Sequence, residues 1–219
     1  MERLLITAAT ITEIKPFLNC FKNKKKVRDD LYSVSNQKVN IDILISGIGI
    51  VSTIYNLTKH LQGNNYKLII NAGIAGSSDS GIKTGQVVEV TEEEFADFGI
   101  VLNNRFISAS DHNFIPETSV FSGNILVNPV KSCLDIPKVK GCTVNTIDYD
   151  RMNKSLISDA QIETMEGAAF FFVCLNEKIP FIEFRSISNR AGDGNKSNWQ
   201  IDESVRTLSE TLTEFISNL

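Results

Sequence analysis

Residues 67–81 read KLIINAGIAGSSDSG, and this stretch decides which fold the chain can adopt. Its first part, 67–71, is a short apolar run, which is typical of a strand covered on both faces of a sheet. The run passes directly into a segment rich in glycine and serine, which we interpret as a turn. In α/β proteins, ligands bind beyond the carboxyl ends of such strands. The stretch therefore predicts a buried strand that ends beside a binding site.

Strands and helices alternate on both sides of this stretch. Thr10 or Thr12 can cap a short first helix, with Pro16 expected in its first turn. The apolar stripe from Ile201 to Leu219 has helical spacing and predicts a helix packed on the core. The expected strands cover 3–9, 31–35, 40–46, 67–71, 86–91 and 181–187, the expected helices begin near 10, 50, 164 and 201, and 95–140 is expected to form short strands and loops. This order predicts an α/β protein around a mostly parallel or mixed sheet.

Composition excludes several classes of protein. Of the 219 residues, 42% are hydrophobic and 22% are charged, which argues against a disordered chain, a collagen or a simple coiled coil. The net charge of -4 does not provide the basic surface that nucleic acids require. The basic run at 22–28 is followed at once by Asp29 and Asp30, so we interpret it as a solvated loop. We see no repeat or linker and expect one domain over residues 1–219.

The sequence also predicts the compartment. No window reaches the eighteen or so apolar residues that a membrane-spanning helix needs, and the N-terminus lacks a convincing signal peptide. We therefore expect a cytoplasmic protein with no membrane partner. The cysteines match no metal-binding pattern and are interpreted as reduced core thiols, and the two histidines as surface or packing residues. These residues are Cys20, Cys133, Cys142, Cys174, His60 and His112. We expect neither a metal nor a cofactor.

Glu166 is the strongest single candidate for a functional residue. It opens the apolar helix expected over 164–177, where a carboxylate is costly unless something binds it. The alternative is an acid that is stabilised by the helix dipole. Glu13 alone is interpreted more readily as an ordinary acid in a first helical turn. Arg185 lies in a buried strand, so we predict an acidic partner such as Glu183 or Glu166, and we expect Trp199 to matter for shape.

Five segments carry a resemblance to a known family. They are TAATITEIKPFL (7–18), SGIGIVSTIYNL (46–57), NAGIAGSSDSGIKTGQVVEV (71–90), ETMEGAAFFFVC (163–174) and FRSISN (184–189). In this order they resemble the nucleoside phosphorylase/hydrolase superfamily, near its methylthioadenosine/S-adenosylhomocysteine nucleosidases and futalosine hydrolases. The resemblance covers residues 3 to about 210 and is weakest between about 100 and 140. It implies a nucleoside phosphorylase-like fold, which is a three-layer α/β/α sandwich with a central mixed sheet.

The resemblance also implies residue roles. Glu13 matches the acid that activates the attacking water, and Glu166 matches the acid that binds the ribose hydroxyls. Ser188 matches the serine of a Ser-Asp pair that handles the purine, but the second residue here is Asn189. The remaining expected substrate-binding residues are Gly73, Ala75, Gly76, Met165 and Ile147. The residue that stacks on the base is left open between Ile147 and Tyr149.

Two departures from the superfamily patterns select the reaction and the base. Phosphorylases hold phosphate with arginines, and the turns AATITE and NAGIAG carry none, so water is the expected nucleophile. A carboxylate at position 189 would suit the 6-amino group of adenine. Asn189 instead offers an NH₂ group to O6 and a carbonyl to a protonated N7, so it favours hypoxanthine.

The resemblance thus implies hydrolysis of futalosine to hypoxanthine and dehypoxanthine futalosine, a step of menaquinone biosynthesis. The stretch SNRAGDGNKSNWQI (188–201) and the segment CTVNTI (142–147) also resemble the futalosine hydrolases. The alternatives are an adenine-releasing nucleosidase acting on methylthioadenosine, adenosylhomocysteine or aminodeoxyfutalosine, a purine nucleoside phosphorylase, and a non-catalytic binding module. The resemblance further suggests a homodimer or a higher homo-oligomer with a small nucleoside as its partner molecule.

Overall fold

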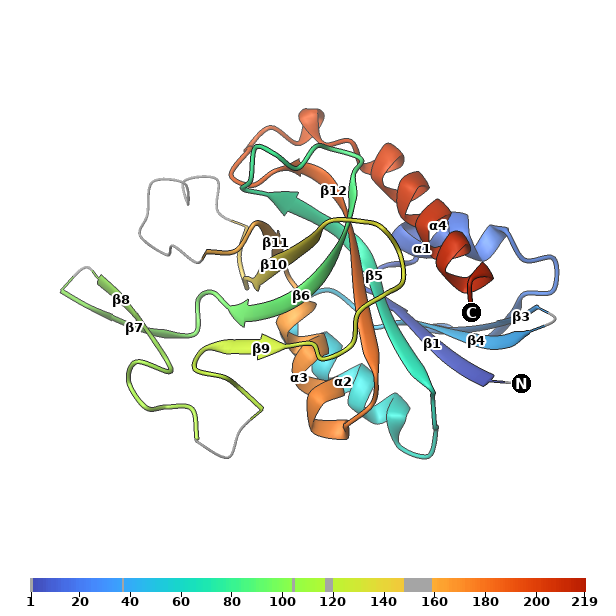
Figure 1. Ribbon diagram of the computed structural model, residues 1–219, viewed down its shortest axis with the longest axis horizontal. Helices are drawn as coiled ribbons and strands as arrows, with labels where there is room; N and C mark the ends of the chain where they lie inside the picture. The colour runs from blue at the N-terminus through green and yellow to red at the C-terminus, as the bar shows by residue number, and fades with distance from the viewer. Residues whose placement is uncertain (1, 37, 104, 117–119, 148–158) are drawn as a thin grey trace.

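The computed structural model describes residues 2–36, 38–103, 105–116, 120–147 and 159–219. In these ranges one ten-stranded sheet has the order β11-β10-β6-β12-β5-β1-β4-β3-β2, with β9 beside β6 (Figure 1). Its strands are β1 (Glu2–Ala8), β2 (Lys25–Arg28), β3 (Leu31–Ser35), β4 (Val39–Ile45), β5 (Leu68–Ser77), β6 (Val87–Phe95), β9 (Ile125–Val127), β10 (Lys138–Thr143), β11 (Ile162–Thr164) and β12 (Phe181–Arg190). A separate hairpin joins β7 (Gly99–Leu102) to β8 (Arg105–Ser108).

The sheet is mixed. β5 lies in parallel between β1 and β12, and β1 is also parallel to β4. β12 is antiparallel to β6 on its other side, and β10 is parallel to both β6 and β11. Because β1, β5 and β12 are parallel neighbours, their carboxyl ends meet at one edge of the sheet. The α/β fold and the mixed sheet expected from the sequence are confirmed.

Four α-helices in the described ranges flank the sheet. They are α1 (Ile11–Asn19), α2 (Ile50–Leu61), α3 (Gly167–Glu177) and α4 (Ile201–Ser217). Figure 1 shows α1 and α4 on one side of the sheet and α2 and α3 on the other. None of the helices in the described part of the chain has the length and the apolar character needed to cross a membrane.

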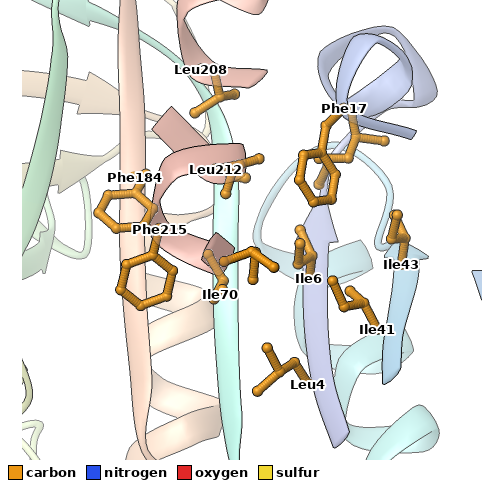
Figure 2. Close-up of a cluster of buried hydrophobic side chains, with 14 of the residues drawn as sticks. Leu4, Ile6, Phe17, Ile41, Ile43, Ile70, Phe184, Leu208, Leu212 and Phe215 are labelled. Atoms are coloured by element: carbon orange, nitrogen blue, oxygen red, sulfur yellow. The ribbon is translucent and has the colours of Figure 1, made fainter. Parts of the chain in front are cut away.

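A buried apolar cluster joins α1 and α4 to the sheet. Figure 2 shows Phe215 and Leu212 of α4 packed towards Phe184 of β12 and Ile70 of β5. The Phe184 and Phe215 rings meet edge to face with their centroids 5.3 Å apart. A second cluster joins α2 and α3 to the opposite face of the sheet. The stripe of α4 therefore packs on the core as predicted, although its two end residues, Ile201 and Leu219, are exposed.

The glycine-rich stretch differs from its expected form. Residues 71–77 are not a turn but continue β5, which is ten residues long. Glycine is a poor strand former in isolation, but β12 pairs with this stretch up to Ser77, and β11 pairs with its last residues. Tertiary pairing here overrides local propensity. The strand therefore carries its glycines directly into the region where the site is expected.

Two smaller expectations also need correction. Thr10 is the N-cap of α1, and Pro16 lies inside that helix rather than in its first turn. Only Cys174 of the four cysteines is fully buried, whereas Cys20 and Cys133 are exposed. Free cysteines outside the core are tolerated because the thiol is a small group with little polar character.

Candidate active site

A cavity of about 280 Å³ opens at the carboxyl ends of β1, β5 and β12. It is lined by Ala9, Thr10, Thr12, Glu13, Ile48, Ile74, Ala75, Gly76, Val144, Ile147, Glu163, Thr164, Met165, Glu166, Ser188, Asn189, Trp199 and Ile201. Eight of the nine candidate residues in the sequence analysis are among them, Gly73 being the exception. Tyr149, the second candidate for base stacking, lies outside the described residues.

Glu13 is held rigidly at one side of this cavity. It is the third residue of α1, the position at which an acid can return to the N-cap backbone in a capping box. Its Oε2 accepts hydrogen bonds from the Thr10 amide and the Thr10 hydroxyl, both at 2.9 Å. Its Oε1 accepts a third bond from the Ile74 amide of β5 at 3.2 Å. The capping role and an active-site role therefore coexist in one carboxylate.

Glu166 lies on the same cavity at the N-cap of α3. Its Oε1 accepts from the Gly49 amide, which precedes α2, at 2.9 Å. Its Oε2 lies 3.9 Å from Nη1 of Arg185. Burial raises the pKa of Glu166 above its ordinary value, while Arg185 and the Gly49 amide act in the opposite direction. Glu166 is thus a buried acid with one amide donor and one distant cation.

Arg185 lies behind the cavity wall and is almost completely buried. Its Nε donates to Oε1 of Glu183 at 2.8 Å, which confirms the acidic partner predicted for this arginine. A Cβ atom on Gly73 would stand 2.1 Å from Nη1 of Arg185 and 2.9 Å from Oε1 of Glu13. Gly73, an expected substrate-binding residue, is not among the residues that line the cavity, and its missing side chain makes room for the guanidinium beside Glu13.

Ser188 and Asn189 form a hydrogen-bonded pair at the end of β12. The Ser188 hydroxyl donates to Oδ1 of Asn189 at 2.8 Å, and Nδ2 of Asn189 donates to the Arg190 carbonyl at 2.8 Å. A flipped amide would set two carbonyl oxygens against each other at Arg190, so this network fixes its orientation. The amide oxygen accepts one hydrogen bond and can accept another, and the amide nitrogen donates one hydrogen bond and can donate another. Asn189 therefore retains one free donor and one free acceptor.

Gly76 allows the Asn189 side chain to lie close to β5. A Cβ at Gly76 would stand 3.2 Å from Nδ2 of Asn189, and the two residues are register partners between β5 and β12. Any larger residue at position 76 would press on the amide.

The remaining walls of the cavity are mainly apolar. Ile48, Val144, Ile147 and Ile201 line it together with the indole-bearing residue Trp199. The sequence analysis did not name Ile48, Val144 or Ile201 as site residues. Ile48 could have been found from its position between Gly47 and Gly49 at the end of a strand. The sequence around Val144 and Ile201 does not distinguish these residues from residues of the core. A flat, partly polar ligand suits such walls.

Comparison with known proteins defines the class to which this fold and cavity belong. The relatives and structural neighbours described below are nucleosidases, which are N-glycosyl hydrolases, and they confirm the enzyme class expected from the sequence. In sequence the chain is similar to nucleosidases of the nucleoside phosphorylase/hydrolase superfamily. No protein-family model matches it.

Three curated relatives resemble the chain over most of its length. The 5'-methylthioadenosine/S-adenosylhomocysteine nucleosidase of Buchnera aphidicola is 26% identical over 209 residues, covering 92% of this chain and 88% of its own. The futalosine hydrolase of Thermus thermophilus is 25% identical over 182 residues, covering 80% of each chain. The aminodeoxyfutalosine nucleosidase of Helicobacter pylori is 25% identical over 235 residues, covering 100% of this chain and 98% of its own.

The fold is also that of solved nucleosidase structures. A Helicobacter pylori nucleosidase mutant with 5'-methylthioadenosine in its active site superimposes with a TM-score of 0.83. The two chains are 20% identical, and the match covers 100% of both. The three relatives carry three different substrate names, so the substrate of this chain has to be argued from its own residues.

Proposed function

We propose that the chain hydrolyses the N-glycosidic bond of futalosine and releases hypoxanthine and dehypoxanthine futalosine. The observation that carries this proposal is the orientation of the Asn189 amide. With Oδ1 bound by Ser188 and Nδ2 bound to the Arg190 carbonyl, one N–H and one lone pair are left. Hypoxanthine protonated at N7 offers O6 as the acceptor and N7–H as the donor, and it matches this pair when Nδ2 faces O6.

The two carboxylates have complementary roles in this mechanism. Positive charge develops on the sugar as the glycosidic bond breaks, so the site needs anions near the ribose. Glu13 orients and deprotonates the attacking water. Glu166 accepts from the ribose 2' and 3' hydroxyls, and this contact strengthens as charge grows. Asn189 stabilises the departing base by hydrogen bonding at O6 and N7, and because an amide has no acidic proton, the proton that N7 takes up comes from solvent water.

Water rather than phosphate is the proposed nucleophile. Among the described residues that line the cavity there is no lysine or arginine. Arg185 is close by, but its Nε is bonded to Glu183 and its side chain is buried behind the wall. A phosphate dianion would therefore meet two carboxylates and no available cation, which is unfavourable.

The second candidate function is release of adenine. It is favoured by the similarity to a methylthioadenosine/S-adenosylhomocysteine nucleosidase and to an aminodeoxyfutalosine nucleosidase. Asn189 argues against it when Nδ2 faces the 6-position of the base, because an amino group there would meet a second donor. A phosphorylase and a non-catalytic binding module are less well supported.

Further parts of the proposal concern the whole chain. We propose a single domain over residues 1–219 with the three-layer α/β/α arrangement, supported by the two apolar clusters on opposite faces of the sheet. We also propose a cytoplasmic homodimer that acts in menaquinone biosynthesis. A homodimer is supported by the exposed apolar side chains of Val51 and Tyr55 on α2 and of Ile48 before it, because such patches on soluble proteins often form interfaces.

One experiment separates these functions. The purified protein is incubated with futalosine, aminodeoxyfutalosine, methylthioadenosine and inosine, each with and without phosphate, and the free base and the sugar product are identified. Release of hypoxanthine from futalosine at a rate independent of phosphate is the expected result. A rate that rises with phosphate, together with a sugar 1-phosphate product, would contradict hydrolysis. Faster release of adenine from the amino substrates would favour the second candidate.

A further inference from the structure

Glu93 is a buried acid that the mechanism above does not use. It lies in β6 between Glu92 and Glu94, and this run of three acids has the pattern of a solvated edge. Because side chains alternate along a strand, the middle acid points to the opposite face from its neighbours. Glu93 is 1% exposed, whereas Lys140 pairs with Glu92 nearer the surface.

Hydroxyl groups connect Glu93 to the first turn of α3. The Ala168 amide donates to Oγ1 of Thr143 at 2.7 Å, and the Thr143 hydroxyl lies 2.9 Å from Oε2 of Glu93. The Gly167 amide donates to Oγ1 of Thr164 at 3.1 Å, and the two threonine hydroxyls are 3.2 Å apart. These two amides are among the four that an α-helix leaves without an internal partner. The N-terminus of α3 is therefore tied to Glu93.

The direction of these hydrogen bonds follows from the number of hydrogens. The Thr143 hydroxyl donates its single hydrogen to Oε2 of Glu93, so Thr164, which accepts from Gly167, is the donor between the two threonines. Oε2 is thus an acceptor. Within the described residues, Oε1 of Glu93 is a buried atom with no hydrogen-bond partner.

Oε1 of Glu93 faces a second buried carboxyl group. A Cβ on Gly167 would stand 2.1 Å from Oε1 of Glu93 and 2.9 Å from Oε1 of Glu183, so the two oxygens share the space that this glycine leaves open. Glu183 has partners at both oxygens, with Nε of Arg185 at 2.8 Å and Nδ2 of Asn71 at 3.0 Å. Both oxygens of Glu183 thus accept hydrogen bonds, and a proton on Oε1 of Glu93 can point towards this carboxyl group.

The surroundings of Glu93 oppose a second negative charge. Burial raises the pKa of Glu93 well above its ordinary value, and the neighbouring Glu183 raises it further. The groups that face it are Thr143 of β10, Thr164 of β11, the first amides of α3, Glu183 and Arg185 of β12, and Glu94 of its own strand. Arg185 is the one cation in this described set, and it is shared with Glu183 and Glu166.

We propose that Glu93 is a positioning residue for Glu166, and that it acts as a neutral carboxylic acid joining the N-terminus of α3 to the Glu183–Arg185 pair. Glu166 is the N-cap of α3 and lies beside Arg185. The N-terminus of α3 and the Arg185 side chain, which Glu93 joins, therefore both help to place the Glu166 carboxylate. The inference rests on the proposed function, because Glu166 is there the group that binds the sugar. It adds Glu93, which does not line the cavity, to the residues that the enzyme needs for its activity.

Two substitutions at position 93 test the link. Glu93→Gln has the shape of the neutral acid and keeps a carbonyl for Thr143, so kcat/KM on futalosine should stay within about threefold of wild type. Glu93→Ala removes the link, and kcat/KM should fall roughly tenfold to a hundredfold, with both kcat and KM affected, because small displacements of a binding group are costly. Glu92→Gln, one residue away on the outer face, is the matched control and should behave as wild type.

Equal losses in Glu93→Gln and Glu93→Ala would overturn the neutral-acid assignment, and no loss in Glu93→Ala would overturn the positioning role.

Three further readouts need no turnover and separate this inference from the proposed function. Wild type should show the infrared carbonyl band of a protonated carboxylic acid, and Glu93→Gln should lack it. In Glu93→Ala, hydrogen exchange at the Gly167 and Ala168 amides should become faster. An acid with a raised pKa takes up a proton on folding, so the contribution of Glu93 to stability falls as pH rises above about 4.5, and the melting temperature of Glu93→Gln relative to wild type should increase with pH. If the infrared band is unchanged in Glu93→Gln, the inference fails even when the enzyme is active. If the band, the exchange rates and the melting temperatures behave as stated but no nucleoside is cleaved, it is the proposed function that fails.

Discussion

The Ser188 hydroxyl lies 2.8 Å from Oδ1 of Asn189, nearer than its other acceptor, the Ala75 carbonyl at 3.2 Å. The partner of the amide nitrogen is the Arg190 carbonyl, which cannot change its hydrogen-bonding character. The face that the amide turns to the cavity is therefore set before any ligand enters. The base selectivity of the enzyme should depend on this single amide.

Asn189→Asp should shift the preference from 6-oxopurine to 6-aminopurine nucleosides. The change preserves volume but replaces the donor that faces O6, and the lost bond and added repulsion cost about 2–4 kcal/mol. This corresponds to a fall of roughly 30- to 1000-fold in kcat/KM on futalosine. The variant carboxyl would lie against the Arg190 carbonyl, which favours its protonated form and hence a proton for N7. The measurement is the ratio of kcat/KM for futalosine and aminodeoxyfutalosine, and an unchanged ratio would mean that Asn189 does not select the base.

Glu13→Gln should lower kcat by roughly 10²–10⁴ with little change in substrate binding, because a general base acts in the transition state. The amide would also set an NH₂ group against one of the donors that now bind the carboxylate, Thr10 or Ile74, so some stability should be lost. Thr10→Val is the matched control, since it removes the hydroxyl bond to Glu13 but leaves the carboxylate. Single-turnover rates and melting curves of both variants separate the two effects. If Thr10→Val lost as much activity as Glu13→Gln, the capping role would explain the result.

Glu166→Gln should weaken both substrate binding and turnover, because Glu166 contacts the ribose before and during bond cleavage. KM should rise and kcat should fall, whereas Glu13→Gln should affect kcat alone. Glu177→Gln, at the exposed far end of α3, controls for a change of charge on the same helix. The split between kcat and KM is read from full saturation curves with futalosine. A pure kcat effect in Glu166→Gln would contradict a ground-state contact with the sugar.

Stability should decrease as the pH falls through the range in which His60 titrates. Its Nε2 lies 2.7 Å from the Tyr66 hydroxyl, which already donates to Asp42, and its Nδ1 faces the guanidinium of Arg28. Burial and Arg28 lower the pKa of His60 below its ordinary value. The unfolded chain therefore binds a proton that the folded chain excludes, and stability is lost below about pH 6.5.

The measurement for His60 is the free energy of unfolding in urea between about pH 7.5 and about pH 5. His60→Gln should be less stable at the upper end but should lose less stability on acidification. His112→Gln, which changes the second histidine of the chain, is the matched variant for comparison. A His60→Gln curve parallel to that of wild type would show that another group causes the decline.

The sequence predicted the structure well where a residue type can be accommodated in only a few ways. Arg185 needed an acid in a buried strand, and the alternation of the strand puts Glu183 two residues away on the same face. The apolar stripe of α4 was equally restrictive. In contrast, NAGIAG resembled a turn because its strand character comes from β12, which is more than a hundred residues away.

The contacts behind the candidate site were the least predictable part. Glu93 stands in a run of acids that resembles an exposed edge, and only the position of α3 against β6 and β10 shows that the middle acid is covered. Gly73 was expected to bind the substrate, and the sequence did not show that its missing side chain also makes room for the guanidinium of Arg185. Long-range contacts of this kind leave no periodic mark in a sequence.

The contact between Gly73 and Arg185 also constrains how this protein can evolve. A methyl group at position 73 would collide with the guanidinium, since its carbon would stand 2.1 Å from Nη1. Loss of the arginine first would leave Glu183 without its 2.8 Å partner and Glu166 without its nearest cation. A side chain at position 73 is excluded for as long as Arg185 is retained, and Arg185 is retained because both carboxylates depend on it. Gly73 and Arg185 should therefore be inherited as a unit.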